Sequence, residues 1–385
     1  MKIVFLQNVI SPHILPLAKA VASIVGANQF RYCAMGHITA QRRKLGWSED
    51  IKEQWLVEYK GASLDEEKEF HQKSGAYDAE FVLCGIRSWG VLRERDGKAL
   101  PSAYVSERWF KPPIGMLRLL SPRFLRMARE FVCLLSRSRQ LLYFPIGIHA
   151  ARDMARLCGL MHGDLLCLFR APEIEIERKP GGRMKLKNGG DGRKYCLDKM
   201  RMWGYYVDSS EKVALPVQEA SKTTPQEIKV LWVGRLLNLK RVDTSLPKIT
   251  LDIYGAGPEE SRLKKMTRGY EDLVHFHPPV SIADVRRLMR EHDVYVLASN
   301  AYEGWGSVVS EALSEGMKVI GTYEAGSSGT ILHDTNLYHC GDWPTLQKLI
   351  EGKLPDIGIG EWNPRGAANA LMDIANGNKP SSEYE

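Results

Sequence analysis

Two carboxylates frame a glycine-rich turn in the segment 303–311, which reads EGWGSVVSE. Glu303 precedes a Gly-Trp-Gly sequence, and the apolar spacing that follows Ser307 predicts the start of a helix. Glu311 falls in the first turns of this helix. A helix N-terminus presents unpaired N–H groups and the positive end of the helix dipole, which favour an anion such as a phosphate. The segment therefore predicts an anion site between two carboxylates.

A second candidate set lies where the apolar run 229–233 ends. Gly234 follows this run directly, and two cations, Arg235 and Lys240, come after it. Cations at the end of a buried strand are placed to neutralise a diphosphate without a metal ion. The plainer alternative is that both side chains decorate a surface turn.

The elements that must position these residues alternate along the chain. Strand-like runs are followed by helical patterns in both halves, which is typical of parallel sheets that helices cover on both faces. A polar segment bounded by prolines, 215–227, is the predicted linker. The fold class is therefore α/β, with two doubly wound domains. The predicted strands are 2–6, 81–84, 102–105, 141–144, 229–233, 250–254, 273–276, 294–298 and 318–321.

The order of these motifs resembles the donor-binding half of family 4 glycosyltransferases, which have the GT-B fold. The resemblance implies two Rossmann-like domains that face each other across a cleft. An acceptor-side domain at 1–214, completed by a helix at 362–376, and a nucleotide-sugar domain at 228–361 are expected. The resemblance covers roughly residues 230–332 and rests on Gly234-Arg235-x4-Lys240, on Gly255 and Gly257, and on Glu303 and Glu311, which match the family's E-x7-E pattern.

The resemblance also implies a role for each group. A nucleotide diphosphate sugar of the UDP or GDP type would meet Glu311 with its ribose, the helix N-terminus with its diphosphate and Glu303 with its hexose. Alternatively, Glu311 only stabilises a helix dipole and Glu303 is a loop carboxylate. The predicted catalytic residues are Arg235, Lys240 and Glu303. The predicted donor-contacting residues are Gly234, Gly255, Gly257, Gly304, Trp305, Gly306, Ser307, Val308 and Glu311.

The resemblance implies transfer with retention at the anomeric carbon, to a glycan or lipid-linked acceptor. A role in polysaccharide, capsule or glycolipid biosynthesis is expected, because most members of the family act in such pathways. No Asp-x-Asp sequence occurs in the chain, so the metal clamp of the other major glycosyltransferase architecture has no ligands. We therefore expect a hexosyltransferase that needs neither a metal nor a cofactor.

Polar residues that follow the predicted strands of the first half are the candidates for the acceptor side. Only their position recommends them, since ligands of α/β sheets bind outside the carboxyl ends of the strands. A lone histidine is more often structural, and Glu107 and Arg108 could equally form a local ion pair. The acceptor-side candidates are Ser11, His13, Arg87, Glu107, Arg108 and His149.

Composition excludes several classes of protein. Of the 385 residues, 44% are apolar and 26% are charged, as in a soluble globular protein. No uncharged apolar run approaches the roughly 20 residues that a membrane span needs. Prolines at 12 and 16 interrupt the first apolar run, which predicts a first strand and no signal peptide. The seven cysteines include no CxxC pair, which favours a reducing cytoplasm over a disulfide scaffold or zinc site.

Two basic segments invite a membrane interpretation. The segment 178–194 holds seven basic residues and one acid, and we expect a mobile, solvated loop, or alternatively a contact with an anionic substrate or lipid surface. The segment 121–135 has a serine N-cap and a proline at the first helical position. It predicts a core-packed helix with a basic outer face, or alternatively a helix that lies on an anionic membrane. We expect a cytoplasmic protein, with peripheral contact at the inner membrane face as the alternative. The predicted core positions of the helix are 124, 125, 128, 131, 132 and 135.

Two rival functions remain open at this stage. The same fold would suit a nucleotide-sugar epimerase or a glycosyl phosphorylase, although no lysine context for pyridoxal is evident. A second rival is a protein that binds a nucleotide sugar or glycan without chemistry. Nucleic acid is not an expected partner, since the basic segments lack interleaved aromatic residues.

Overall fold

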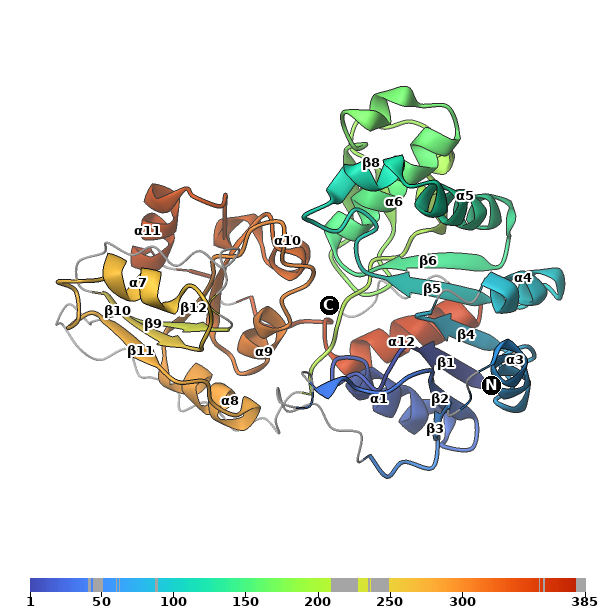
Figure 1. Ribbon diagram of the computed structural model, residues 1–385, viewed down its shortest axis with the longest axis horizontal. Helices are drawn as coiled ribbons and strands as arrows, with labels where there is room; N and C mark the ends of the chain where they lie inside the picture. The colour runs from blue at the N-terminus through green and yellow to red at the C-terminus, as the bar shows by residue number, and fades with distance from the viewer. Residues whose placement is uncertain are drawn as a thin grey trace. The chain divides into compact units, whose positions relative to one another are not determined.

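The computed structural model describes residues 1–40, 43, 51–59, 61, 63–86, 89–208, 228–234, 236, 249–352, 354–355 and 357–378. The chain forms two compact units: Met1–Tyr206 together with Pro364–Glu385, and Val207–Asn363 (Figure 1). Three predicted site residues, Arg87, Arg235 and Lys240, lie outside the described residues. The predicted linker 215–227 lies outside them too.

The first unit is built on a parallel sheet with the order β3-β2-β1-β4-β5-β6. Every residue of β1 and β4 is buried, because helices cover both faces of the sheet. The chain builds outward from β1 to β3 and then from β4 to β6 on the other side, so the order reverses between β1 and β4. Such a reversal leaves room for a ligand at the carboxyl ends of the strands. The strands are β1 Ile3–Gln7, β2 Phe30–Ala34, β3 Leu56–Glu58, β4 Phe81–Cys84, β5 Ser102–Ser106 and β6 Leu141–Pro145.

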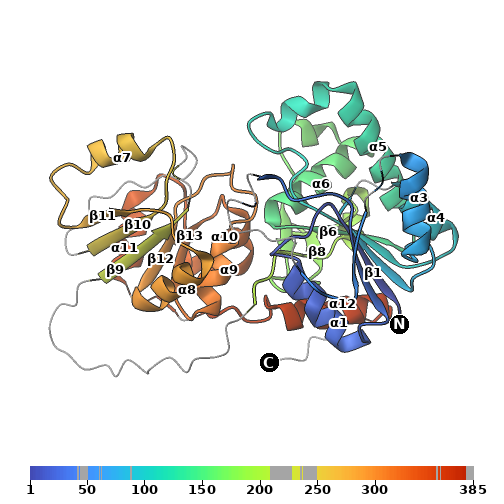
Figure 2. The same ribbon diagram turned by 60° about the horizontal axis from the view of Figure 1, so that its bottom comes forward.

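Helices of the first unit flank this sheet (Figure 2). The α-helices are α1 Leu15–Val25, α3 Leu64–Lys73, α4 Trp89–Gly97, α5 Pro122–Arg137, α6 Ile148–Met161 and α12 Pro364–Ala375. The 3-10 helices are η1 Gly115–Leu120, η2 Leu165–Leu168, η3 Gly192–Tyr195 and η4 Leu197–Lys199.

The second unit repeats this topology, with the order β11-β10-β9-β12-β13-β14. Strand β9 shows how the sequence supports burial on both faces, since Trp232 packs into one apolar cluster and Leu231 into the other. The strands are β9 Ile228–Val233, β10 Ile249–Tyr254, β11 Val274–His277, β12 Val294–Leu297, β13 Lys318–Thr322 and β14 Leu337–Tyr338. The helices are α7 Glu260–Met266, α8 Ile282–Glu291, α9 Val308–Ser314, α10 Gly326–Ile331, η5 Asp334–Asn336 and α11 Trp343–Glu351. The predicted α/β class with two doubly wound units is confirmed.

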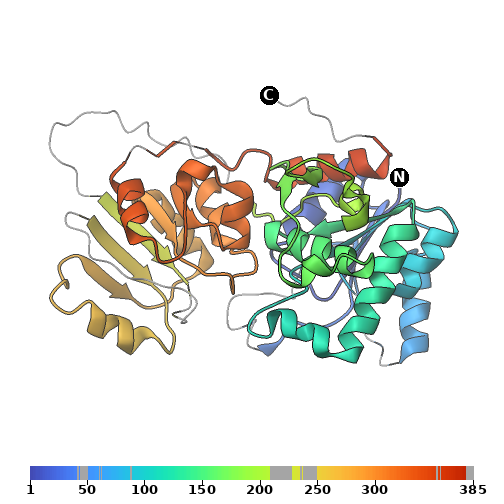
Figure 3. The ribbon, with the colours of Figure 1, turned by 90° about the horizontal axis from the view of Figure 1, so that it is seen from above.

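The last helix belongs to the first unit although it follows the second one in sequence. Helix α12 packs against α1, and the views in Figures 2 and 3 both place it there, in red. Its inward face is made of small and apolar side chains, among them Ala367, Ala368 and Leu371. Trp362, predicted to start this helix, instead lies in the second unit, where its ring centroid is 6.0 Å from that of Trp305.

The predicted helix at 121–135 is present as α5. The Ser121 hydroxyl accepts a hydrogen bond from the backbone N–H of Phe124 at 3.3 Å, and Pro122 occupies the first turn. Five of the six predicted core positions are buried, but Leu125 is 38% exposed. Within the described ranges, no helix has the length and apolar character needed to cross a bilayer.

The prediction of a mobile loop at 178–194 is wrong in part. Residues Met184–Leu186 form strand β8, which pairs in antiparallel fashion with β7, Ile174–Ile176. Both strands alternate apolar and charged residues, and Ile174 and Met184 are buried on the inner side. Lysines and glycines dominate the composition of this segment, but this short alternation decides its structure.

Candidate active site

The two carboxylates of the segment 303–311 lie at the carboxyl end of β12. The backbone N–H of Glu303 donates to the carbonyl of Asn300 at 3.0 Å, and the hydroxyl of Ser299 donates to Glu303 Oε2 at 3.2 Å. Glu303 is therefore held in a turn directly after the strand, with its side chain partly buried. The predicted helix start after Ser307 is confirmed, since α9 begins at Val308.

One tyrosine lies close to both carboxylates and to the end of the neighbouring strand. The Tyr295 hydroxyl on β12 donates to the carbonyl of Val233, the last residue of β9, at 3.3 Å. Burial raises the pKa of Tyr295, and the negative charges of Glu303 and Glu311 raise it further. The charges of Glu303 and Glu311 therefore both act on the tyrosine that joins β12 to the end of β9, where the strand order of the sheet reverses.

Glu311 itself is held in an unfavourable environment for a charge. Desolvation raises the pKa of Glu311, and the nearby Arg286 of α8 lowers it in part. Arg286 also donates to the carbonyl of Asp208 at 2.8 Å and lies 3.8 Å from Glu315. The guanidinium of Arg286 thus interacts with several groups, so it compensates the negative charge of Glu311 only in part.

The Gly-Trp-Gly turn is fixed by its packing against the start of α10. Gly306 has a φ of +83°, which favours glycine, and a Cβ on Gly326 would fall 2.0 Å from the carbonyl oxygen of Gly304. Ser327 closes the contact, because its N–H donates to the carbonyl of Trp305 at 2.8 Å and its hydroxyl to that of Gly306 at 2.9 Å. The Trp305 side chain is 3% exposed. It therefore packs in the interior of the second unit.

Gly255 and Gly257 allow two loops to approach each other closely. A Cβ on Gly255 would lie 1.9 Å from the carbonyl oxygen of Gly234, and one on Gly257 would lie 2.2 Å from that of Leu236. Backbone hydrogen bonds join the loops, from Gly234 N–H to Tyr254 O and from Leu236 N–H to Ala256 O, both at 3.1 Å. These glycines hence have a packing role that the resemblance did not imply. They hold Gly234 and Leu236 against the segment that follows β10.

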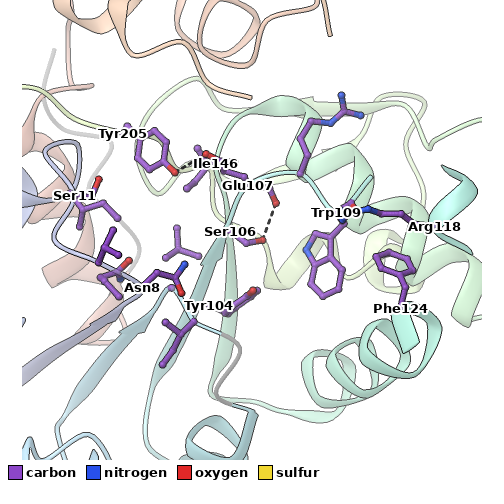
Figure 4. Close-up of a pocket in the computed structure, with 17 residues that line it drawn as sticks. Asn8, Ser11, Tyr104, Ser106, Glu107, Trp109, Arg118, Phe124, Ile146 and Tyr205 are labelled. Carbon is purple, nitrogen blue, oxygen red and sulfur yellow. Dashed lines mark hydrogen bonds between the residues drawn. The ribbon is translucent and has the colours of Figure 1, made fainter. Parts of the chain in front are cut away.

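The first unit contains a pocket of about 560 Å³ at the carboxyl edge of its sheet. Figure 4 shows Asn8, Ser11 and Tyr205 at one end of this pocket and Trp109, Arg118 and Phe124 at the other. It lies where the strand order reverses between β1 and β4, since both strands contribute lining residues through the segments that follow them. The lining residues are Gln7, Asn8, Val9, Ser11, Ile14, Gly85, Ile86, Tyr104, Val105, Ser106, Glu107, Arg108, Trp109, Arg118, Phe124, Ile146 and Tyr205.

Three of the predicted acceptor-side residues, Ser11, Glu107 and Arg108, line this pocket. His13 lies beside it, with its ring centroid 5.5 Å from that of Tyr205. His149 lies in the first turn of α6 and is not part of the lining.

Glu107 and Arg108 each pair with other groups. Glu107 accepts a hydrogen bond from the Tyr205 hydroxyl at 2.9 Å and an ion pair from Lys111 at 3.1 Å. Arg108 makes a two-pronged contact with Asp153, with both N···O distances at 3.2 Å. Asp153 is only 5% exposed and also accepts from a backbone N–H, so Arg108 compensates a buried charge. Glu107 is the carboxylate that the pocket can offer to a ligand.

Several residues of both sites gave no signal in the sequence. Tyr205 is 98 positions from Glu107 in sequence, and it lies in an irregular segment that no strand or helix pattern marks. Arg118 belongs to η1 and donates to the carbonyl of Trp109 at 2.9 Å. Tyr295 and Arg286 sit inside ordinary strand and helix patterns, where a core tyrosine and a surface arginine are the default interpretations.

Comparisons with known proteins agree with the geometry of the second unit. Residues 218–354 match the model of the family "Glycosyl transferases group 1". Most of the second unit is therefore similar to glycosyltransferases of this group. This matched range contains Gly234, Arg235, Lys240, Glu303 and Glu311.

Two curated relatives are similar to part of this chain. Both are UDP-N-acetylglucosamine–peptide N-acetylglucosaminyltransferase GtfA subunits. The protein of Streptococcus gordonii is 29% identical over 135 residues, which cover 30% of this chain and 26% of the relative. The protein of Streptococcus pneumoniae serotype 4 is 31% identical over 126 residues, which cover 28% of this chain and 24% of the relative. The similarity thus spans about a quarter of these relatives' length.

Two solved structures are similar to almost the whole chain. The lipopolysaccharide outer core galactosyltransferase WaaB, in its apo form, has a TM-score of 0.63 at 14% identity, covering 98% of this chain and 99% of its own. Anabaena HepE in complex with UDP has a TM-score of 0.55 at 17% identity, covering 98% and 96%. The fold is GT-B, as the sequence predicted.

Proposed function

We propose that this protein is a family 4 glycosyltransferase that transfers a sugar from a nucleotide diphosphate sugar to a glycan or lipid-linked acceptor. The convergence of Glu303, Glu311 and the end of β9 around Tyr295 carries this proposal. These groups lie within the range that matches the glycosyl transferases group 1 family. The transfer proceeds with retention and needs neither a metal nor a cofactor.

Glu311 binds the ribose of the donor. Its carboxylate accepts hydrogen bonds from the two ribose hydroxyls, and these bonds stabilise the charged form that burial disfavours. Glu303, beyond the glycine turn, is the corresponding acceptor for hexose hydroxyls. The backbone of residues 304–308 lies between the two carboxylates and faces the diphosphate.

Arg235 and Lys240 stabilise the leaving diphosphate. They follow Gly234, whose carbonyl packs against Gly255 next to the strand end that Tyr295 contacts. Two cations here oppose the negative charge that grows on the leaving oxygen, so they lower the barrier to transfer. The departing phosphate takes the proton of the acceptor hydroxyl.

The relatives favour a uridine nucleotide as the donor's leaving group. The similar GtfA subunits are named for UDP-N-acetylglucosamine, and the similar HepE structures are complexes with UDP and with UDP-glucose. The sugar itself is not constrained by this similarity.

The pocket of the first unit receives the acceptor. It offers Glu107 as an acceptor of hydrogen bonds, Arg118 as a donor, and the rings of Trp109 and Tyr104 as apolar faces. A sugar presents hydroxyls at its edges and C–H groups on its faces, so this mixture of groups suits a glycan.

A surface beside this pocket favours an acceptor that is carried by an anionic membrane. Ile114 just before η1, Leu117 and Leu120 in η1, and Leu125 in α5 are exposed, and the exposed fractions of Leu117 and Leu120 are 66% and 79%. Three exposed arginines of α5, 123, 126 and 129, adjoin these side chains, and the only acid of the helix, Glu130, pairs with Arg93. The same two elements supply Arg118 and Phe124 to the pocket. Apolar groups ringed by cations bind anionic lipid.

The setting is polysaccharide, capsule or glycolipid biosynthesis at the inner face of the cell membrane. All seven cysteines are described and none forms a disulfide, which supports a reducing compartment.

A product assay with and without acceptor tests the proposal. UDP and GDP sugars that raise the melting temperature are incubated with the protein and a glycan or glycolipid acceptor, and the products are analysed. Transfer to the acceptor with release of nucleoside diphosphate is expected. Interconversion of the donor without acceptor would instead indicate an epimerase. Binding with no turnover under any condition would indicate a binding protein.

Flotation with liposomes tests the membrane contact. We expect the protein to float with anionic vesicles and to stay behind with neutral ones. The double substitution Leu117→Ser and Leu120→Ser should abolish flotation, whereas Met266→Ser, which removes a similarly exposed side chain from the second unit, should leave it unchanged. Equal flotation of both variants would contradict the assignment of this surface.

A further inference from the structure

Three imidazoles and one carboxylate meet at the β10–β11 edge of the second sheet. Asp252 lies on β10, His275 and His277 lie on β11, and His292 directly follows α8. Asp252 Oδ1 is 2.6 Å from His277 Nε2 and 3.4 Å from His275 Nδ1, and Asp252 Oδ2 is 3.2 Å from His292 Nε2. The potential ligand atoms of Asp252, His275 and His277 all lie within 4.8 Å of one another.

His292 holds the carboxylate of Asp252 from the inner side. Its Nδ1 donates to the carbonyl of Leu288 at 2.7 Å, which fixes the ring, and its Nε2 lies 3.2 Å from Asp252 Oδ2. A carboxylate that binds a metal is commonly held by such an outer partner. His292 therefore orients Asp252, whose Oδ1 faces the two histidines of β11.

The spacing of Asp252, His275 and His277 fits three ligands of a small tetrahedral ion. With bonds of about 2.1 Å, two ligands of tetrahedral zinc are about 3.4 Å apart. The pair Asp252–His275 already has 3.4 Å. The pair Asp252–His277, at 2.6 Å, would need to open by about 0.8 Å (3.4 − 2.6), which side-chain rotation supplies. Imidazole nitrogens favour zinc and its neighbours over magnesium or calcium.

The cluster is rigid and open to solvent. Asp252 and His275 are register partners in the β10–β11 ladder, and the His277 ring stacks on Tyr254 with centroids 4.2 Å apart. The side chains of His275 and His277 are 40% and 33% exposed, so an ion can enter. His292, 7% exposed, forms the inner wall.

We infer that Asp252, His275 and His277 form a zinc site that ties β10 and β11 together, with His292 orienting Asp252 from the end of α8. The ion is structural, and it does not take part in the proposed transfer. It also steadies the glycine loop of the candidate active site, because the His277 carbonyl accepts the N–H of Gly255 at 3.2 Å.

Zinc binding to the tag-free full chain tests this inference. After removal of metals with EDTA, ZnCl2 is titrated while the melting temperature is followed, and bound zinc is measured by mass spectrometry after gel filtration. We expect one equivalent of zinc. At a concentration 100-fold above Kd we expect a rise in Tm of roughly 5 to 10 °C. Cobalt should bind with the visible absorption of a tetrahedral site, and magnesium should cause no shift.

Variants separate this site from incidental binding. His275→Gln and His277→Gln should lose the zinc-dependent rise in Tm. His339→Ala should keep it, because His339 is an exposed histidine that faces one carboxylate, Glu324, at 3.1 Å. Circular dichroism checks that each variant folds. A wild-type chain without bound zinc, or a shift of equal size in His277→Gln, would overturn the inference. Neither readout depends on transferase activity, so the proposed function is tested separately.

Discussion

The two units share one sheet topology but assemble their polar sites in different ways. In the second unit the residues around Tyr295 come largely from one contiguous segment, 303–311, and from the strand end at Val233. In the first unit the pocket takes residues from Gln7 to Tyr205, across almost the whole unit. A site built from one short segment leaves a motif in the sequence, whereas a site built from dispersed residues does not.

This contrast has a chemical basis. The nucleotide and diphosphate are the same in many donors, so a fixed set of glycines and charges can serve them, which is the role proposed for residues 303–311. Acceptors differ in shape, and the pocket proposed for the acceptor is lined by side chains such as Tyr205 and Arg118, held by irregular segments. Irregular segments change more readily than the sheet that supports them.

The largest expected effect is on turnover in the second unit. Glu311→Ala and Lys240→Ala should each lower kcat/KM for the nucleotide sugar by about 100-fold or more, because each removes a charge to which the proposed function gives a donor contact. Steady-state kinetics with the preferred donor measures this loss. Glu107→Ala, in the first unit, should act mainly on the KM for acceptor. The contrast between the units fails if Glu107→Ala reduces donor turnover as much as Glu311→Ala does.

A large effect on stability is expected at the loop contact. Gly255→Ala would place a Cβ 1.9 Å from the carbonyl oxygen of Gly234, so the loops must separate, at a cost of about 2 to 4 kcal/mol in the free energy of unfolding. Urea unfolding measures this change. Gly90→Ala in α4 is the matched control, because its Cβ would meet no atom within 4 Å. An unchanged midpoint in Gly255→Ala would refute the packing role.

A smaller effect is expected from one hydroxyl of the first unit. Tyr205→Phe removes the hydrogen bond of 2.9 Å to Glu107 and should raise the KM for acceptor by about three- to tenfold. The dissociation constant of the nucleotide sugar should stay the same. Calorimetry of donor binding, beside kinetics with varied acceptor, distinguishes the two. Weaker donor binding in this variant would mean that the pocket does not belong to the acceptor.

The smallest expected effect concerns the stability cost of Glu311. Its pKa is raised in the folded chain, so the folded state binds the proton more tightly than the unfolded state, whose glutamates titrate near about pH 4.3. At low pH Glu311 is therefore neutral and lowers the free energy of unfolding little. As the pH rises through the raised pKa of Glu311, its buried charge begins to destabilise the folded state. Glu311→Gln should melt about 1 to 3 °C higher than the wild type at pH 7, and the difference should vanish below about pH 4. A lower melting temperature for this variant at pH 7 would contradict the raised pKa.

Most of the fold could be predicted, because the spacing of apolar residues and the composition of the turns indicate where strands and helices lie. The nine predicted strands all occur, with ends that differ by one residue or so, and the serine cap and proline of α5 mark its start. The pattern failed at 178–194, where three alternating residues form β8 inside a segment rich in glycine and lysine. A strand this short gives too few repeats for its alternation to stand out.

The sites were predictable only where neighbours in sequence are also neighbours in space. Glu303 and Glu311 could be paired from their spacing, but Tyr295, whose pKa both charges raise, looks like any core residue of a strand. Gly255 and Gly257 were singled out for ligand contact, although carbonyl groups of another loop account for them. The cluster of Asp252 with three histidines spans 41 positions, from 252 to 292, and contains no known motif.

The return of α12 to the first unit has a consequence for synthesis on the ribosome. The apolar face of α1, with Leu17 and Val21, emerges early from the ribosome. Helix α12, which covers this face with Ala367, Ala368 and Leu371, is synthesised roughly 340 residues later. At about 5 to 20 residues per second, this face waits roughly 20 to 70 s for its partner helix. During translation the nascent chain therefore exposes an apolar helix face that chaperones can bind. Truncation before Pro364 removes the helix that covers this face in the first unit.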